Sequence, residues 1–338
     1  MTCALANNLA KNGYSVSIIT WLGGTKSFFS LDKEVTIYNL FKEDNVNIYK
    51  SYFTTLYRYY KVKKYLKPDY IIDVCTAQSI VSIPANIFCK SKIISWEHFN
   101  TAVNWNPITG PLSRKLASVF ANKIVVLTST DQSNYQAIYK AKNVKTIGNP
   151  ITINITDTCD VSKKNVLTVA RFTHQKGLDL LLHSWQKVIK KCPEWKLTIV
   201  GDGELKSEIV NLRGQLELDS SVEIFDATNN ISQFYKEASI YAMSSRFEGM
   251  PLVLIEAKCY GLPIVSFNYE TGPRDIVKDG FDGYLVEPFD LDKFANKIIN
   301  LALNNDLRQE FSTNALSGRD EFSINKFISK WIEIFHNK

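Results

Sequence analysis

The segment Ser244-Ser-Arg-Phe-Glu-Gly-Met-Pro-Leu-Val-Leu-Ile-Glu-Ala257 contains a change of hydrophobic pattern that bears directly on the fold. It follows the apolar run 240–243, which predicts a strand, and its second half has apolar residues at helical spacing from Leu252 onward. Pro251 suits the first position of a helix, because proline has no amide hydrogen to donate there. The segment therefore predicts a strand, a polar loop and a helix, which is the repeating unit of parallel α/β sheets.

The loop in this segment has the properties of an anion site. Gly249 has no side chain, so the backbone can approach a ligand closely. Met250, Pro251 and Leu252 lead into the helix, whose free amides and positive dipole end attract an anion such as a diphosphate. We therefore expect these four residues to line a diphosphate site.

Two carboxylates flank the predicted helix start. Glu248 precedes the helix and Glu256 lies inside it, so at ~1.5 Å rise per residue the two are roughly 8 to 10 Å apart. One could hold the hydroxyls of a sugar while the other takes the hydroxyl pair of a ribose. The alternative is that Glu248 only caps the helix and Glu256 is a surface residue of an amphipathic helix.

Short β-branched or aromatic runs alternate with helical patterns along the whole chain. The predicted strands cover 15–20, 35–39, 70–74, 92–96 and 123–127, then 165–170, 196–200, 222–225, 240–243, 263–266 and 283–286. This alternation predicts parallel sheets covered by helices on both faces, which is the doubly wound α/β class.

A length of 338 residues favours two domains. The sequence predicts one Rossmann-like domain over 1–150, a second over 151–320 that begins with a polar linker at 151–164, and a C-terminal helix over 321–338 that packs back toward the first domain. Ligands of such sheets bind at the carboxyl ends of the strands, in the crevice between the domains.

The start of the chain departs from this class. Residues 1–13 read as a helix that ends at the C-cap Gly13 and leads into the strand at 15–20. A doubly wound domain usually opens with a strand and a glycine-rich turn, and neither is present. We expect the first strand of the N-terminal domain to be missing. If the chain as given is the whole protein, the domain should be less stable, because a sheet buried on both faces lacks an inner strand.

Composition excludes several classes of protein. With 45 % hydrophobic and 22 % charged residues the chain is not disordered or collagenous. No apolar run approaches the ~18 residues that cross a bilayer, and polar asparagines interrupt the N-terminus where a signal peptide needs an apolar core. The six scattered cysteines form no C-x-x-C pair and predict buried thiols in a cytoplasmic protein, without disulfides or a zinc site.

The charge is distributed unevenly. Residues 1–150 carry 18 Lys and Arg against 8 Asp and Glu, a net charge of +10, whereas the rest carries 22 against 26, a net charge of −4. The densest basic patch interleaves tyrosines and lysines over 57–67 on a predicted helix. It is either a solvated helix face or a surface that meets anionic lipid or a polyanionic acceptor. No helix-turn-helix, zinc-finger or RNP-like pattern favours nucleic acid.

The segment 244–257 resembles the E-x7-E signature of retaining nucleotide-sugar glycosyltransferases of family four, of the polysaccharide-biosynthesis type. Further motifs follow in the family's order: Trp96-Glu-His98-Phe-Asn100, Arg171-Phe-Thr-His-Gln-Lys176-Gly177, Gly201-Asp-Gly203, Thr271-Gly-Pro-Arg-Asp275 and Asp282-Gly-Tyr-Leu-Val286. The similarity covers nearly all of the chain. It implies the GT-B fold, two Rossmann-like domains facing each other across a cleft, with the donor held by the second domain.

The resemblance also implies roles for single residues. Arg171 and Lys176 would place two cations beside the diphosphate and neutralise charge on the leaving group. Gly201 and Gly203 would border the donor, although a G-x-G turn after a strand also opens many helices without a ligand. His98 is either a structural histidine or a group that bonds the transferred sugar or positions the acceptor.

The implied mechanism retains the configuration of the sugar. The acceptor hydroxyl attacks from the face that the diphosphate leaves, so a phosphate oxygen can take the proton, and Glu248 serves as a sugar ligand more readily than as a nucleophile. No metal is expected. Asp290-Leu-Asp292 has the form of a metal–diphosphate motif, but it precedes a predicted helix, where Asp290 is a ready N-cap and Asp292 favours the dipole.

Two features depart from the family pattern. Asp275 stands where the family more often has Glu, which shortens the reach of the carboxylate. The absent opening strand and glycine-rich loop mean either that the sequence lacks roughly the first twenty to twenty-five residues of the family's pattern, or that the protein is shortened and its acceptor domain impaired.

We expect a cytoplasmic glycosyltransferase that moves a hexose or N-acetylhexosamine from a nucleotide sugar, a UDP-sugar above all, to a glycan. The acceptor that best explains the basic half is a polyprenyl-diphosphate-linked glycan at the inner membrane face, in surface or capsular polysaccharide assembly. No cofactor is expected beyond the co-substrate. The alternatives are an epimerase or phosphorylase on the same fold, and a shortened pseudoenzyme that binds nucleotide through Arg171, Lys176 and Glu256 without turnover.

Overall fold

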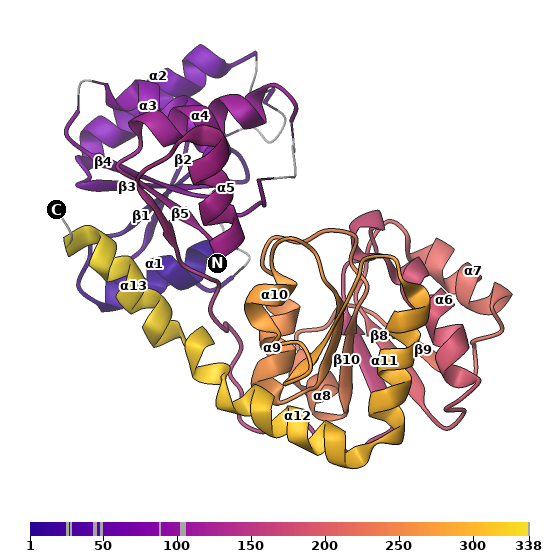
Figure 1. Ribbon diagram of the computed structural model, residues 1–338. Coiled ribbons are helices and arrows are strands. Elements are labelled where there is room, and N and C mark those ends of the chain that lie inside the picture. Colours follow the sequence, from indigo (N-terminus) through magenta and orange to yellow (C-terminus); the bar gives the residue numbers. More distant parts are fainter. Residues whose placement is uncertain are drawn as a thin grey trace. The chain divides into compact units, whose positions relative to one another are not determined.

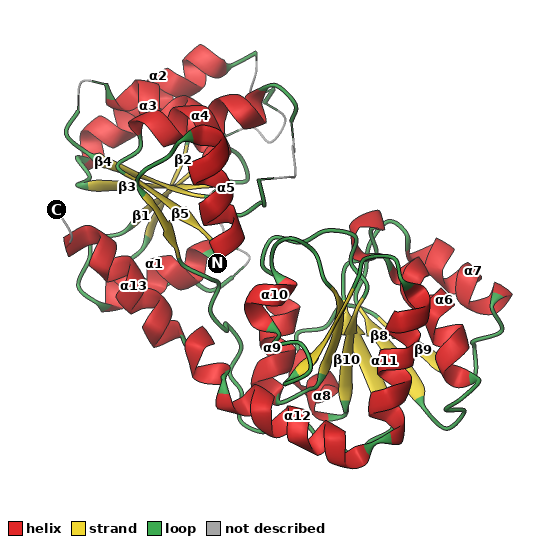
Figure 2. Ribbon diagram, viewed as in Figure 1, coloured by secondary structure: helices red, strands yellow, loops and turns green. Residues whose placement is uncertain are grey.

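The computed structural model of the protein describes residues 1–24, 27, 29–42, 46–47, 50–87, 89–101 and 106–336 (Figure 1). The chain divides into two compact units: Met1–Thr152 with Ile324–Lys338 form unit 1, and Ile153–Ser323 form unit 2. Each unit has parallel strands with helices on both faces (Figure 2). The predicted α/β class with doubly wound parallel sheets is confirmed.

Unit 2 holds one six-stranded parallel sheet in the order β12-β11-β10-β7-β8-β9. Its strands are β7 (Asn165–Val169), β8 (Lys196–Val200), β9 (Val222–Phe225), β10 (Ile240–Met243), β11 (Ile264–Phe267) and β12 (Gly283–Val286). The chain runs outward from β7 to β9 and then returns to β10 on the other side of β7. The strand order therefore reverses between β7 and β10, and such a switch point is where open α/β sheets bind ligands.

Helices cover both faces of this sheet, as Figure 2 shows. They are α6 (Leu178–Ile189), α7 (Lys206–Gln215), α8 (Ile231–Lys236), α9 (Leu252–Tyr260), α10 (Pro273–Ile276), α11 (Leu291–Leu303) and α12 (Asn305–Ser317), with short helices η2 (His174–Lys176) and η3 (Arg319–Phe322). Every residue of β10 and β11 is buried, which is why their sequences are apolar apart from Ser266 and do not alternate.

Unit 1 holds two parallel sheets instead of one. A four-stranded sheet has the order β3-β4-β5-β6, and β1 pairs with β2 alone. The strands are β1 (Ser17–Thr20), β2 (Thr36–Asn39), β3 (Tyr70–Val74), β4 (Lys92–Trp96), β5 (Lys123–Val126) and β6 (Val144–Thr146). In the described part of unit 1 no strand joins β1 to β3.

The helices of unit 1 are α1 (Thr2–Lys11), α2 (Tyr52–Leu66), α3 (Ser79–Asn86), α4 (Thr109–Phe120), α5 (Ser129–Tyr139), α13 (Ile324–His336) and the short η1 (Thr76–Gln78). α13 returns to this unit from the far end of the sequence (Figure 1). Its Trp331 packs edge-on against Trp96 of β4 with ring centroids 5.0 Å apart, and its Phe335 packs on Tyr70 at 4.8 Å. The apolar stripe of α13 is thus buried on unit 1.

Several local expectations need correction. α9 begins at Leu252, one residue late, because Pro251 has an extended ψ of 116° and is the N-cap. β6 was not expected, since Val-Lys-Thr is too short for a clear pattern. The predicted linker is anchored on unit 2 in its second half, where the Cys159 amide donates to the Tyr260 carbonyl at 2.8 Å.

The cysteines are less buried than expected. All six thiols are free, but only Cys192 and Cys259 are buried, and the other four are half-buried. No group of three His, Cys, Asp or Glu side chains in the described ranges is arranged to hold a metal ion. Within the same ranges, no helix combines the length and the apolar character that a bilayer crossing requires.

Candidate functional site

Two loops of unit 2 meet at the switch point of its sheet. One follows β7 and contains Arg171 and Lys176, and the other follows β10 and contains Glu248. Because β7 and β10 are adjacent parallel strands, both loops leave the same edge of the sheet. The fold therefore brings together segments that are about seventy residues apart in the sequence.

The central contact of the site is an ion pair between these loops. Lys176 Nζ donates to Glu248 Oε1 at 2.6 Å, and the two side chains are only 16 % and 7 % exposed. Thr271 Oγ1 donates to the Glu248 carbonyl at 2.8 Å, which holds the backbone of the second loop. A cation and a carboxylate are thus fixed side by side at the carboxyl edge of the sheet.

Arg246 ties the two loops together. Its guanidinium forms a two-pronged pair with Asp179 at 2.9 and 2.6 Å, and Nη1 also donates to the His174 carbonyl at 2.8 Å. Its backbone amide donates to the Gln175 carbonyl at 2.7 Å. Two-pronged pairs of this kind fix geometry as well as adding energy, so Arg246 sets the position of the loop that carries Lys176.

Glycines allow the loops to pack at backbone distance. A Cβ on Gly177 would lie 2.2 Å from the Ser244 carbonyl oxygen, and one on Gly201 would lie 1.9 Å from that of Ala170. Gly203, with φ +154°, would place a Cβ 2.6 Å from the Phe172 carbonyl oxygen. Glycine is therefore required at positions 201 and 203 because this turn packs closely against the loop after β7, and not only because α7 begins nearby.

Glu256 is half-buried on α9 of unit 2. Its carboxylate accepts a hydrogen bond from the Tyr235 hydroxyl at 2.7 Å. Burial raises the pKa of this carboxyl, and the bond from Tyr235 partly opposes that rise. Tyr235 is itself held by stacking on Tyr260, with ring centroids 4.9 Å apart. Glu256 is thus not the exposed surface residue of the alternative interpretation.

The segment before α9 approaches the distal loop closely. Met250 and Pro251 are buried, whereas Gly249 and Leu252 are half-buried. A Cβ on Gly272 would lie 2.3 Å from the Gly249 carbonyl oxygen. The amides at the start of α9 therefore lie next to the backbone of Gly249 and of the loop at Gly272.

Three acidic residues of the motifs have structural partners. Asp282 is buried and pairs with Lys258 at 2.6 Å. Asp290 is the N-cap of α11, as expected, and accepts from the Lys293 amide at 2.9 Å, while Asp292 pairs with Lys187 at 2.6 Å. Arg171, the predicted cation of the first loop, has no such ion-pair partner among the described residues, and its side chain is exposed.

His98 belongs to unit 1, at the carboxyl end of β4. Its ring packs on Trp96 with centroids 4.2 Å apart, and burial lowers its pKa to about 4, so it is neutral at pH 7. In the described part of the chain its buried Nε2 has no hydrogen-bond partner. Such a nitrogen can accept from or donate to a bound hydroxyl.

Glu97, the residue before His98, forms a buried ion pair with Arg114. Glu97 Oε2 accepts from Arg114 Nε at 2.9 Å, from the Tyr135 hydroxyl at 2.8 Å and from Thr76 Oγ1 at 2.9 Å. Arg114 also donates to the carbonyls of Asn100 and Thr101 at 3.0 and 3.2 Å. The loop that carries His98 is therefore fixed from both ends.

Comparison with known proteins assigns the family. Residues 158–317 match the family described as glycosyl transferases group 1. An uncharacterized glycosyltransferase of Haemophilus influenzae is 34 % identical over 97 % of this chain and 92 % of its own length. The chain belongs to the group 1 glycosyltransferases.

Two further relatives have more specific names. The amylovoran biosynthesis glycosyltransferase AmsD of Erwinia amylovora is 31 % identical over 98 % of this chain and 93 % of its own length. A Campylobacter jejuni enzyme is 30 % identical over 98 % of this chain and 92 % of its own, and is named as an α-1,4-N-acetyl-D-galactosaminyltransferase acting on a PP-undecaprenol-linked glycan.

Solved structures confirm the fold of this glycosyltransferase. The Anabaena protein HepE, solved in complex with UDP, superposes with a TM-score of 0.79 at 18 % identity, over 96 % of this chain and 100 % of that one. Sucrose-phosphate synthase of Thermosynechococcus elongatus gives a TM-score of 0.83 at 17 % identity, over 98 % and 91 %. The predicted GT-B fold is thus confirmed.

Sequence reasoning missed the residues that support the glycosyltransferase site. Tyr235 and Arg114 lie on helices outside every motif, and Asp179 lies two residues beyond the motif that ends at Gly177. Arg246 and Glu97 lie within the motif segments 244–257 and 96–100, but a motif does not show which partner a side chain contacts. The sequence does contain one signal of a buried charge pair: Arg114 stands at a position of α4 that the helical pattern assigns to the core.

Proposed function

We propose that this glycosyltransferase transfers a hexose or N-acetylhexosamine from a UDP-sugar, with retention of configuration, to a glycan or lipid-linked glycan in surface polysaccharide assembly. In this proposal Arg171 and Lys176 bind the diphosphate, Glu248 binds hydroxyls of the transferred sugar, and Glu256 binds the ribose. The loop at Gly201 and Gly203 and the amides from Gly249 to Leu252 border the same donor.

The observation that carries the proposal is the ion pair between Lys176 and Glu248. A nucleotide sugar places a dianionic diphosphate next to a ring of hydroxyls, so its site needs a cation and a hydrogen-bond acceptor next to each other. Lys176 and Glu248 provide this pair at 2.6 Å on neighbouring loops, and both side chains are largely shielded from water. The start of α9 adds backbone amides on the same side, which favours bound anionic oxygens.

The proposed step breaks the bond between the anomeric carbon and the diphosphate oxygen, and forms one between that carbon and the acceptor oxygen. The acceptor hydroxyl attacks from the face that the diphosphate leaves, and its proton passes to the departing phosphate oxygen. Arg171 and Lys176 stabilise the charge on the leaving group without a metal ion. Because Glu248 is held by Lys176, it acts as a sugar ligand and not as a nucleophile.

His98 is proposed to bond the transferred sugar or the acceptor. It is neutral at pH 7 and its buried Nε2 lacks a partner among the described residues, which suits a hydrogen bond to a hydroxyl. The lipid-linked acceptor is supported by the PP-undecaprenol-linked acceptor in the name of the Campylobacter relative and by the net charge of +10 on residues 1–150. We infer a peripheral location at the inner membrane face from the same charge.

Titration calorimetry tests the donor site. UDP, a panel of UDP-hexoses and GDP-mannose are titrated into the wild type and into Glu256→Ala and Lys176→Ala. We expect micromolar to millimolar binding of UDP, weakened roughly 10- to 100-fold by either variant, since a hydrogen bond to a charged group contributes about 1.5–3 kcal/mol. The sugar that binds most tightly identifies the donor.

Glu208→Ala is the matched control. Glu208 is also a helical glutamate of unit 2, but it is exposed on α7, so its removal should leave UDP affinity unchanged. Equal loss in Glu208→Ala and Glu256→Ala would point to a general charge effect and contradict the assignment of Glu256. Tighter binding of GDP-mannose than of any UDP-sugar would overturn the choice of nucleotide.

A further inference from the structure

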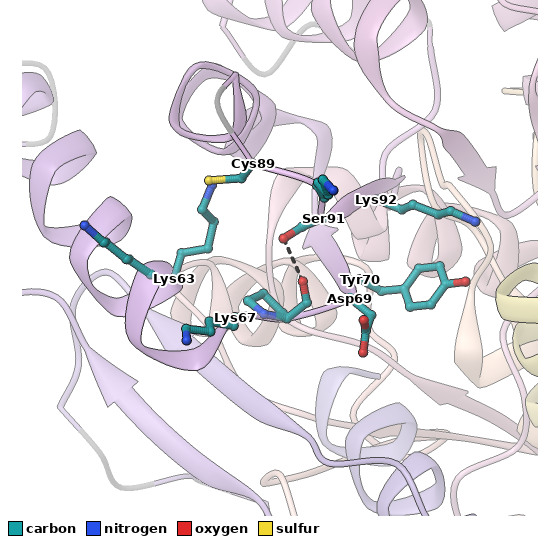
Figure 3. A pocket seen from close by; sticks show the side chains of 10 residues that line it. Lys63, Lys67, Asp69, Tyr70, Cys89, Ser91 and Lys92 are labelled. Atoms are coloured by element: carbon teal, nitrogen blue, oxygen red, sulfur yellow. Dashed lines mark hydrogen bonds between the residues drawn. The ribbon is translucent and has the colours of Figure 1, made fainter.

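A basic pocket opens at the amino ends of β3 and β4 in unit 1 (Figure 3). It has a volume of about 610 Å³, and five of its ten lining residues are lysines: Lys63, Lys64, Lys67, Lys90 and Lys92. Asp69 is the one carboxylate in that lining. With a net charge of +4 in a concave surface, the pocket concentrates positive potential and attracts anions.

The lysines have no acidic partners in the described part of the chain. None of the ion pairs there includes any of the five, although other lysines of the protein form several. Lys63 is buried and donates to the Ala85 carbonyl and to Asn86 Oδ1, so it forms part of the pocket wall. Lys64, Lys67 and Lys90 are exposed. Unneutralised charge of this density predicts an anionic ligand.

The helix that supplies Lys63 and Lys64 has an unusual outer face. Phe53, Tyr57 and Tyr65 of α2 are 82 %, 57 % and 76 % exposed, and α2 contains no acidic residue. Lys61 lies over the Tyr57 ring at 4.7 Å from its centroid. Exposed aromatic rings interleaved with lysines suit the headgroup layer of a bilayer, where apolar rings lie beneath charged amines.

We propose that the outer face of α2 and the lysine pocket form a docking surface for a bilayer of anionic phospholipids. The lysines bind headgroup phosphates, and the aromatic rings of α2 enter the interface. This surface is distinct from the His98 region, because Lys92 begins β4 and Trp96 ends it, about 13 Å away along the strand. The docking surface rests on the peripheral location proposed above and gives it a site. Because vesicle binding needs neither donor nor acceptor, a failure of this test leaves the proposed glycosyl transfer standing.

The experiment is sedimentation of the full chain with vesicles. Vesicles of equal parts phosphatidylglycerol and phosphatidylcholine should bind the protein at low salt and release it as salt rises, and pure phosphatidylcholine should not bind it. Lys64→Gln with Lys90→Gln should weaken partitioning about 30-fold, from the usual gain per lysine at an acidic surface. Phe53→Ser should weaken binding while leaving its salt dependence in place.

Lys190→Gln with Lys191→Gln is the matched control. It removes the same charge from exposed residues at the end of α6 in unit 2. An equal loss of vesicle binding in the two double variants would show that net charge and not this surface is responsible, and would overturn the proposal. So would equal binding to both kinds of vesicle, or tighter binding to single-stranded RNA in the same buffer. Circular dichroism confirms that each variant is folded.

Discussion

Removing the guanidinium of Arg114 should destabilise unit 1 and loosen the loop that carries His98. Arg114 and Glu97 are 0 % and 1 % exposed, and their charged groups are 2.9 Å apart. Arg114→Met would leave the Glu97 carboxylate in the core without a counter-charge. It would also remove the hydrogen bonds that Arg114 donates to the carbonyls of Asn100 and Thr101. Breaking one side of a buried pair costs about 3–5 kcal/mol.

Two measurements report the loss of stability in Arg114→Met: the melting temperature and the rate of hydrogen exchange. For a unit of this length each kcal/mol lowers the melting temperature by about 2–4 °C, so Arg114→Met should lower the transition of unit 1 by roughly 6–20 °C. Hydrogen exchange followed by mass spectrometry resolves the two units. Peptides covering 97–101 and α4 should exchange faster in the variant, whereas peptides covering β8 of unit 2 should not change.

Lys187→Met is the matched control for this prediction. Lys187 and Asp292 are 2.6 Å apart but 43 % and 79 % exposed, so this pair should contribute less than about 1 kcal/mol. In the double variant Glu97→Gln with Arg114→Met the loss should be clearly smaller than the sum of the single losses, because neither charge is left alone. Additive losses, or unchanged exchange over 97–101 in Arg114→Met, would refute the reasoning.

Three further predictions concern a glycine, a buried carboxyl and the histidine. Gly201→Ala should destabilise unit 2 by at least about 1–3 kcal/mol in urea unfolding, since its Cβ would lie 1.9 Å from the Ala170 carbonyl oxygen, whereas Gly214→Ala, a helical position with no atom nearer than 3.8 Å, should stabilise it slightly. Burial raises the pKa of Asp73 to about 7, so the native state holds this proton more tightly than the unfolded chain, and the stability of unit 1 should fall as pH rises from 4 to 7. Asp73→Asn should therefore stabilise unit 1 at pH 8 and much less at pH 5; equal effects at both pH values would contradict this. Since burial lowers the pKa of His98 to about 4, its ring signals in nitrogen-15 NMR spectra should stay those of a neutral imidazole between pH 5.5 and 8, and a titration in that range would show that the ring is solvated.

The sequence by itself determined the class of the fold and most of its strands. A strand buried on both faces must be continuously apolar and a helix beside it must be apolar on one side, so Ile240–Met243 and Leu252–Tyr260 are visible from their own residues. The same local chemistry placed the start of a helix at Pro251, one residue before the observed Leu252, and marked Asp290 as an N-cap. The E-x7-E segment and the motifs around it were sufficient to assign the family.

Only the tertiary structure decided which of these residues touch. Lys176 and Glu248 are 72 residues apart, and they meet because β10 returns to pair with β7, a choice that no local pattern encodes. The pairing of Glu97 with Arg114 and of Glu256 with Tyr235 likewise depends on how helices pack on their sheets. Local periodicity reports only that a residue is buried; the contacts between distant segments follow from strand order, and strand order is set by the free energy of the whole fold.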